Sequence, residues 1–285
     1  MIIKSVSRKK LEIKENGRST DFLTPTIIMG CSFNCSYCYC KRHKTEGVDI
    51  SDNLNDILTE VNNHAMFTFI DKPNQTHSKY ITYDIGCNSD MALHAKHYNW
   101  KKVFGFFKDH PKAMGSFATK YVNYNLLDFN PENKMRIRFS LMPDKLSKIL
   151  EPYTSSIEER IKAIDLFIEA GYDVHINFSP IIYYYEWLKD YEELFNKVNK
   201  LVINKDKVLC EVIFLTHNRK KHLYNLENHI SGEYLLWTPE LQEDKISEYG
   251  GENIRYKLDI KSKFIDQWTE LHDKIIPWNK IRYIF

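Results

Sequence analysis

Residues 30–40 read Gly-Cys-Ser-Phe-Asn-Cys-Ser-Tyr-Cys-Tyr-Cys, with Cys31, Cys35 and Cys38 in the spacing Cys-x3-Cys-x2-Cys. Three thiolates at this spacing can hold one face of a 4Fe-4S cluster, because cysteine sulfur is the usual protein ligand of iron–sulfur clusters. The fourth iron then has no protein ligand and is open to another molecule. We therefore expect these three cysteines to bind a 4Fe-4S cluster.

The same spacing resembles the signature of the radical S-adenosylmethionine (SAM) superfamily. In that superfamily the amino and carboxylate groups of SAM chelate the open iron, and an electron from the cluster cleaves SAM to methionine and a 5′-deoxyadenosyl radical. The cofactor supplies this chemistry while the protein positions it. The resemblance implies SAM as the second cofactor.

A zinc site or reduced structural thiols are the alternatives for these cysteines. Zinc usually takes four ligands from paired Cys-x2-Cys or Cys/His units. Here a Cys-x3-Cys step precedes Tyr37-Cys38-Tyr39, and no second cysteine pair follows downstream, which favours the cluster. Cys40 has three open interpretations: a spare thiol, a surrogate ligand or a buried side chain.

The bulk composition is that of a globular protein. Of 285 residues, 43% are hydrophobic and 27% charged, so a large core is available and disorder is not expected. A formal charge of +2 and a pI of about 8.1 are compatible with DNA without arguing for it. No signal peptide and no apolar run of about 18 residues stand out. The six cysteines do not suggest a secreted disulfide framework, and we expect a cytoplasmic protein with no membrane contact.

A repeated order of strand and helix predicts the fold class. Six strands, most of them followed by a helix, indicate an α/β fold, namely a partial (β/α)6 TIM-like barrel. The barrel is expected over residues 24–230, after an N-terminal lead-in at 1–23 that adds at most an edge strand. Residues 231–285 are expected to form a small β-hairpin and helix extension of this single catalytic domain. The expected strands are 24–29, 79–85, 113–119, 135–141, 173–178 and 207–215; the expected helices begin near 54 and 218 and cover about 89–109, 156–170, 186–201 and 261–275.

Polar side chains follow the expected strands where each strand ends. In α/β barrels the reactive groups gather at the carboxyl ends of the strands. We therefore expect a thiol, an ammonium group, hydroxyls and an imidazole to surround one mouth above the cysteine loop. These groups belong to Cys87, Lys120, Ser140, Ser179 and His217. Each taken alone has an ordinary structural explanation, and their shared placement favours a joint role.

Motifs along almost the whole chain from about residue 24 resemble the spore photoproduct lyase family. The family's Tyr-Cys-Tyr and Cys-x-Ser-Asp motifs are matched by residues 37–39 and 87–90. Its Thr-Lys and Arg-Phe-Ser motifs appear at residues 119–120 and 138–140. Further matches are Glu-Pro-x-Thr-Ser at 151–155, Glu-x-Arg-Ile at 158–161, Ala-Gly-Tyr at 170–172, Ser-Pro-Ile at 179–181, Thr-His at 216–217, Tyr-Gly at 249–250 and Ile-Arg-Tyr at 281–283.

This resemblance implies a DNA-repair lyase that converts the thymine dimer called spore photoproduct back to two thymines. The 5′-deoxyadenosyl radical would abstract the C6 hydrogen, the methylene bridge would break, and Cys87 would return a hydrogen atom. Tyr37 and Tyr39 would relay the radical back toward SAM. Lys120 and Ser140 would hold the SAM carboxylate, and Ser89 would bind SAM nearby. The resemblance also implies lesion-bearing DNA and an electron donor such as flavodoxin or ferredoxin as partners of a monomer.

The chemistry of Cys87 favours the role of hydrogen-atom donor independently of the resemblance, because an S–H bond is weak enough to give a hydrogen atom to a carbon radical. The alternative is that Cys87 is a small buried hydrophobic residue. For Tyr37 and Tyr39 the alternative is packing of their rings beside the cluster.

Several departures from the family pattern concern the substrate. The family's longer segment ahead of the cluster has no counterpart here, and Glu248 stands where the family has an arginine that lies against the lesion. A carboxylate repels a phosphodiester, so Arg255 and the run Arg219-Lys220-Lys221 are expected as substitute phosphate contacts or as a solvated face. A related radical SAM enzyme acting on another nucleobase or a peptide is therefore one alternative. A non-catalytic metal-binding or nucleic-acid-binding module is the other.

Overall fold

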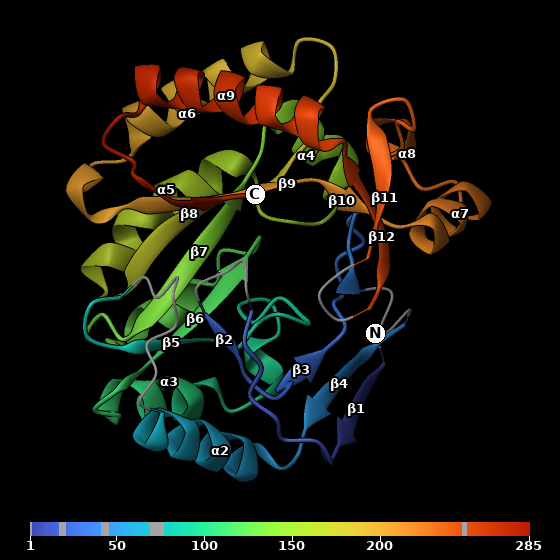
Figure 1. Cartoon of the computed structure of the whole chain (residues 1–285). Coiled ribbons are helices and arrows are strands. Elements are labelled where there is room, and N and C mark those ends of the chain that lie inside the picture. The colour runs from blue at the N-terminus through green and yellow to red at the C-terminus, as the bar shows by residue number, and fades with distance from the viewer. Residues whose placement is uncertain (1, 17–20, 41–45, 69–76, 247–249) are drawn as a thin grey trace.

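The computed structural model describes residues 2–16, 21–40, 46–68, 77–246 and 250–285. A curled sheet of seven strands forms its centre (Figure 1), and every neighbouring pair in it is parallel. Its spatial order is β13 (Ile281–Ile284), β9 (Leu209–Phe214), β8 (Asp173–Ile181), β7 (Met135–Leu141), β6 (Ala113–Thr119), β5 (Ile81–Asp84) and β2 (Phe22–Leu23). The expected partial barrel is confirmed, with seven strands rather than six. The two outer strands come from the expected lead-in and the expected extension.

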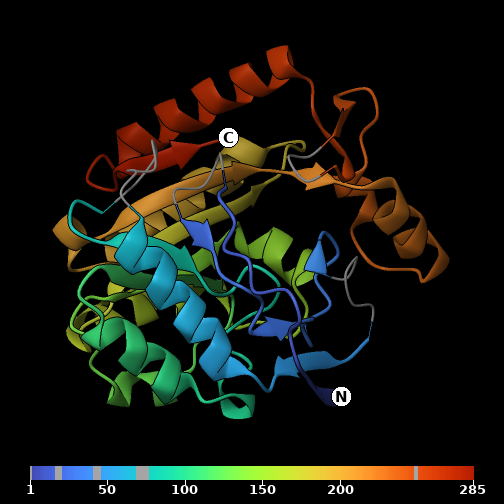
Figure 2. The ribbon, with the colours of Figure 1, turned by 60° about the horizontal axis from the view of Figure 1, so that its bottom comes forward.

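Helices cover the outer face of this sheet (Figures 1 and 2). They are α2 (Leu54–Phe67), α3 (Trp100–Asp109), α5 (Ile157–Glu169), α6 (Trp187–Leu201) and α9 (Leu258–Ile275). The shorter helices are α4 (Asp144–Leu150), α7 (Arg219–Glu227) and α8 (Glu233–Leu236), with 3-10 turns at Ala95–His97, Tyr124–Asp128 and Lys205–Lys207. In the part of the chain that is described, no helix is both long and apolar enough to cross a membrane.

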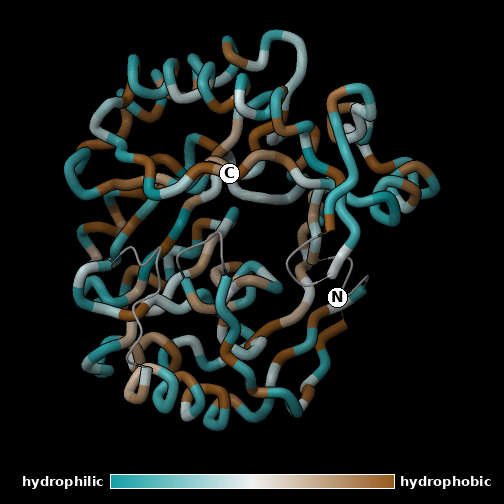
Figure 3. The backbone as a smooth tube through the Cα atoms, in the orientation of Figure 1, coloured by the Kyte–Doolittle hydropathy of each residue, from teal (hydrophilic) through white to brown (hydrophobic). Residues whose placement is uncertain are grey.

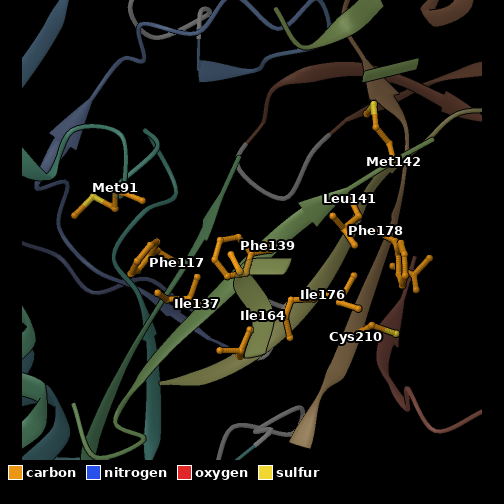
Figure 4. Close-up of a cluster of buried hydrophobic side chains, with 14 of the residues drawn as sticks. Met91, Phe117, Ile137, Phe139, Leu141, Met142, Ile164, Ile176, Phe178 and Cys210 are labelled. Atoms are coloured by element: carbon orange, nitrogen blue, oxygen red, sulfur yellow. The ribbon is translucent and has the colours of Figure 1, made fainter. Parts of the chain in front are cut away.

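The core lies between the sheet and these helices. All seven residues of β7 are buried, as expected for a parallel strand covered on both faces. Figure 4 shows Phe139 and Ile176 from adjacent strands beside Ile164 of α5. Helix α5 begins where predicted, because Ser156 and Glu159 form a reciprocal capping box. It ends at Gly171, whose φ of 86° favours glycine.

The expected strand at 24–29 is wrong. Strand β2 ends at Leu23, just before Pro25, which has no N–H to donate to a strand ladder. The chain then forms β3 (Ile28–Met29), which pairs antiparallel with β4 (Val48–Ser51). Strand β4 also pairs with β1 (Ile3–Val6), giving a separate three-stranded sheet. The cysteine loop therefore follows a strand of this small sheet, beside the barrel.

The expected helix over 89–109 is shorter than predicted, because its first half is a loop. The Asp90 carboxylate accepts a hydrogen bond from the Leu93 N–H at 3.0 Å, which holds a turn. Asn99 then caps α3 by accepting from the Lys102 N–H at 3.0 Å. Residues 89–99 thus lie outside α3, and Ser89 and His94 in this segment contact the cysteine loop.

A third sheet consists of β10 (Thr216–His217), β12 (Glu252–Tyr256) and β11 (Gln242–Ile246), all antiparallel. Strands β11 and β12 form the expected hairpin, which is mostly hydrophilic (Figure 3). Glu248 and Tyr249 lie outside the described residues. The expectation that His217 ends a barrel strand is wrong, since the chain leaves β9 before this residue and pairs with the hairpin instead.

A buried charge network joins the barrel strands from β5 to β13. Glu211 on β9 accepts hydrogen bonds from Arg138 at 3.2 Å and from the Tyr283 hydroxyl at 2.7 Å, and it also pairs with Arg282. Arg138 extends the network to Asp84 on β5, at 2.6 Å. Burial alone would raise the pKa of Glu211, yet Arg138 and Arg282 outweigh it and hold this pKa well below its ordinary value of 4.5. Two arginines from different strands thus depend on one carboxylate.

We predict that Glu211→Gln lowers the free energy of unfolding by about 3 kcal/mol at neutral pH, because Arg138 and Arg282 lose the buried carboxylate that they share. The lowered pKa means that the native carboxylate contributes stability above pH 4.5 and loses it as the pH falls through its folded-state pKa. The difference between wild type and variant should therefore shrink in acid. Urea unfolding between pH 3 and pH 7 measures it, with Glu169→Gln on the exposed face of α5 as control. An equal effect of both substitutions would contradict the prediction.

Candidate active site

The cysteine loop begins at Gly30, whose φ of 94° turns the chain out of β3. Cys31 and Cys35 are buried and Cys38 is half-buried, and all three lie in one small cluster with Phe33, Leu93 and Tyr121. A turn in which the Cys38 N–H donates to the Cys35 carbonyl at 3.1 Å brings the second and third thiols together. The structure therefore gathers the three predicted ligands on one side of the loop.

The chemistry of these thiols fits an iron–sulfur cluster. Burial raises the pKa of Cys31 to about 12 and that of Cys35 well above its ordinary value, while the Lys120 ammonium group opposes both shifts. Such thiols keep their protons until a metal displaces them. The nearby positive charge favours the thiolate form that a cluster requires.

Hydrogen bonds join the cysteine loop to the turn that carries Cys87. The Gly30 N–H donates to the Asn88 carbonyl at 3.0 Å, and the Ser89 hydroxyl donates to the Gly30 carbonyl at 2.6 Å. The Tyr39 hydroxyl donates to the backbone carbonyl of Cys87. These hydrogen bonds therefore hold Cys87 and Ser89 against the cysteine loop, which itself contains Tyr39. All three residues were predicted from the sequence.

Cys87 is a protonated thiol in this setting. Burial raises its pKa to about 12, and the Asp84 carboxylate adds to the shift. Asp84 is itself fixed, because it accepts from the Gly86 N–H at 2.8 Å and from Arg138 at 2.6 Å. At neutral pH the side chain therefore carries the S–H bond that hydrogen-atom donation requires.

Tyr37 lies on the other side of the loop. Its hydroxyl donates to Glu151, and the Lys120 Nζ lies 5.6 Å from the centre of its ring. Burial would lower the pKa of Lys120, but Glu151, Cys35 and Asp90 together outweigh this effect and raise it. Glu151 also pairs with Arg160 at 2.8 Å. Lys120 thus stays positively charged beside the three cysteines.

Ser140 is fully buried near the end of β7. Its hydroxyl accepts from the Asn177 side chain at 3.3 Å, and its carbonyl accepts from Arg160 at 2.8 Å. The ion pair of Arg160 and Glu151 therefore connects Ser140 with Lys120, because Arg160 donates to the Ser140 carbonyl and Glu151 favours the charge of Lys120. Of the other two expected members of the mouth, Ser179 lies within β8 rather than after it, and His217 is buried against Glu233 at 3.0 Å.

Sequence reasoning assigned no role to three residues that organise the site: Asp90, Glu151 and Arg160. Asp90 accepts from the Thr119 hydroxyl at 2.7 Å and from the Lys120 N–H at 2.8 Å. It thereby fixes the end of β6 to the Cys87 turn. The sequence offered one indication of their importance, because Asp90 and Glu151 lie within the motifs that resemble the family. The partners of Asp90 on β6 lie 29 and 30 residues away, and Tyr37, a partner of Glu151, lies 114 residues away, so no local pattern reveals them.

Residues 2–285 match the family model described as spore photoproduct lyase. The chain belongs to the spore photoproduct lyase family. Family membership makes it a radical SAM lyase, in agreement with the expectation from the cysteine spacing.

Curated relatives and solved structures agree with this assignment. The spore photoproduct lyase of Clostridium acetobutylicum is 29% identical over 271 residues, which cover 91% of this chain and 76% of the relative. That of Bacillus subtilis is 29% identical over 285 residues, covering 97% of this chain and 80% of the relative. A solved spore photoproduct lyase complexed with dinucleoside spore photoproduct has the same fold. Its TM-score is 0.87 at 21% identity, with 99% of this chain and 82% of that chain covered.

We predict that Cys31→Ala abolishes cluster assembly, because the loop then offers two thiols instead of three. Iron and acid-labile sulfide after anaerobic reconstitution measure the effect. Cys210→Ala is the matched control, since that buried thiol lies on β9 at 3.7 Å from His272. Full iron content in Cys31→Ala would remove this residue from the ligand set.

Proposed function

We propose that this chain splits spore photoproduct in ultraviolet-damaged DNA back to two thymines, with Cys87 as the hydrogen-atom donor. The observation that carries the proposal is the position of Cys87, whose turn is held through Tyr39 and Gly30 against three clustered cysteines. A hydrogen donor beside a radical-generating site suits a reaction in which the product radical must be quenched. The family and the motif at residues 87–90 support the same substrate.

The residues present would accommodate both cofactors. Cys31, Cys35 and Cys38 would hold a 4Fe-4S cluster, and Lys120, whose charge is retained, would pair with the SAM carboxylate. The Ser140 hydroxyl, which accepts from Asn177, would donate its hydrogen to the SAM carboxylate, and Ser89, whose hydroxyl lies on the Gly30 carbonyl, would bind SAM nearby. When bound, the two cofactors supply the 5′-deoxyadenosyl radical that removes the C6 hydrogen of the lesion. A solved variant of a spore photoproduct lyase holds both SAM and dinucleoside spore photoproduct.

Cys87 acts after the methylene bridge has broken and left a carbon radical on one thymine. The S–H bond of Cys87 breaks, a C–H bond forms on that carbon, and a thiyl radical remains on sulfur. The Tyr39 O–H can replace the lost hydrogen, since the Tyr39 hydroxyl donates to the Cys87 backbone carbonyl. Tyr39 thus restores the thiol and becomes a phenoxyl radical. Tyr37, two residues earlier in the loop, continues the relay toward the SAM site.

Lesion-bearing DNA is the proposed partner. The two linked thymines must leave the base stack to reach Cys87. Arg219 and Arg255 are less available for phosphate than the sequence suggested. Arg219 pairs with Asp244 at 2.9 Å, Arg255 pairs with Glu243 at 3.0 Å, and Lys221 is buried. Phosphate contacts by these arginines therefore require exchange of their carboxylate partners. We also propose that the protein is a cytoplasmic monomer and that flavodoxin or ferredoxin is its electron donor.

Anaerobic reconstitution followed by reaction with dithionite, SAM and a spore-photoproduct dinucleotide tests the function. Thymine and 5′-deoxyadenosine formed in parallel would support the lyase. Deoxyadenosine without thymine would overturn the substrate and favour the alternative of another nucleobase or a peptide. Zinc in place of iron, with no SAM cleavage, would favour the non-catalytic module.

We predict that Cys87→Ala retains SAM cleavage but loses most of its thymine yield, because the product radical has no donor and forms other adducts. Chromatography of the reaction products checks both parts. Cys210→Ala should keep the wild-type product ratio. Clean thymine formation by Cys87→Ala at the wild-type yield would refute the role of this thiol.

Tyr39→Phe removes the hydroxyl on the Cys87 carbonyl and with it the proposed first relay step. We predict that about tenfold more SAM is consumed per thymine pair. This ratio corresponds to a change of about 1.4 kcal/mol in the free-energy difference between return of the radical to SAM and its loss. The ratio of 5′-deoxyadenosine to thymine measures it. Tyr185→Phe is the control, because that ring is 87% exposed. An unchanged ratio in Tyr39→Phe would exclude Tyr39 from the relay.

A further inference from the structure

Three side chains with metal-ligating atoms meet beside the cysteine loop, outside the set assigned to the active site. They are His217 on β10, His222 on α7 and Glu233 at the start of α8. Their ligand atoms all lie within 4.8 Å of one another. Glu233 Oε1 lies 3.0 Å from His217 Nε2 and 2.5 Å from His222 Nδ1. Both imidazoles therefore point one nitrogen at the same carboxylate oxygen.

This cluster is buried and its members are held in orientation. His217 is 1% exposed, and Glu233 and His222 are 7% and 17% exposed in their side chains. The His222 ring stacks on Trp237 with 3.9 Å between centres and 11° between planes. The second oxygen of Glu233 accepts a hydrogen bond from the Asn225 side chain. Ligands fixed by such outer contacts lose little freedom when a metal binds.

We propose that His217, His222 and Glu233 form a binding site for a divalent first-row cation, with zinc as the preferred ion. Two imidazole nitrogens and one carboxylate oxygen are a donor set that zinc takes in proteins. Each imidazole would present a nitrogen lone pair to the metal, with its proton on the other ring nitrogen. Three protein ligands leave a fourth tetrahedral position for water.

The site is connected to the cysteine loop through one side chain. Asn225 donates both to Glu233 and to the carbonyl of Ser36, the latter at 2.8 Å. The Ser36 hydroxyl in turn donates to the Ser231 carbonyl at 2.8 Å, just before α8. Ser36 stands between Cys35 and Tyr37. A cation at this position therefore fastens α7 and α8 to the backbone that carries the three cysteines.

The test uses reconstituted holoprotein, in which iron and sulfide occupy the three cysteines, so that zinc does not compete for those thiols. Loosely bound metal is removed by a chelating resin, and zinc alone is then titrated anaerobically. We expect one equivalent of zinc per chain and a rise in melting temperature, both independent of catalytic activity. Elemental analysis reports zinc and iron separately in the same sample.

Substitutions then locate the bound ion. Glu233→Gln and His222→Gln should each weaken zinc binding by at least about 100-fold, because even the loss of an outer partner costs about 10- to 100-fold. His229→Gln, an exposed imidazole just after α7, is the matched control and should bind zinc as wild type does. Wild-type holoprotein that takes up no zinc would overturn the proposal, whatever the folding of the variants. Equal affinity in His222→Gln and His229→Gln would also overturn it.

Discussion

The active site depends on the hydrogen bonds between Gly30 and the turn that carries Cys87. A three-cysteine loop holds a cluster only if its backbone is fixed, and a hydrogen donor acts only within reach of the radical. In the function we propose, the bonds from Gly30 to Asn88 and from Ser89 to Gly30 would meet both requirements at once. Tyr39 adds a third connection at the far end of the loop. Displacement of this turn would therefore impair cluster binding and hydrogen donation together.

The barrel beneath this site is held by charge as well as by apolar packing. Arg138 pairs with Asp84 just below Cys87 and with Glu211 two strands further on. The negative charge of Asp84 helps to keep the Cys87 thiol protonated, while Arg138 balances that charge within the barrel. Stability of the sheet and the protonation state of the donor thus share one ion pair.

Sequence patterns predicted the elements whose residues carry their own signal. Strands β6 and β7 were placed to the residue, since β6 is a mostly apolar run and β7 alternates apolar and polar residues, and α5 was placed because Ser156 and Gly171 mark its ends. The strand at 24–29 and the helix at 89–109 failed where Pro25, Asp90 and Asn99 changed the backbone path. The pairing of His217 with Glu233 could not be predicted from the sequence, because it joins β10 to α8 and no local pattern links these two elements.

Transfer of hydrogen from Cys87 is the central claim, and its isotopic origin is the most direct measurement. A thiol hydrogen exchanges with solvent, whereas carbon-bound hydrogens of SAM and of the lesion do not. Repair of a spore-photoproduct dinucleotide by wild-type enzyme in D2O should therefore place one deuterium in the methyl group of one thymine per lesion. Mass spectrometry of the released thymine reads this directly. Efficient repair that yields thymine without solvent deuterium would contradict the account.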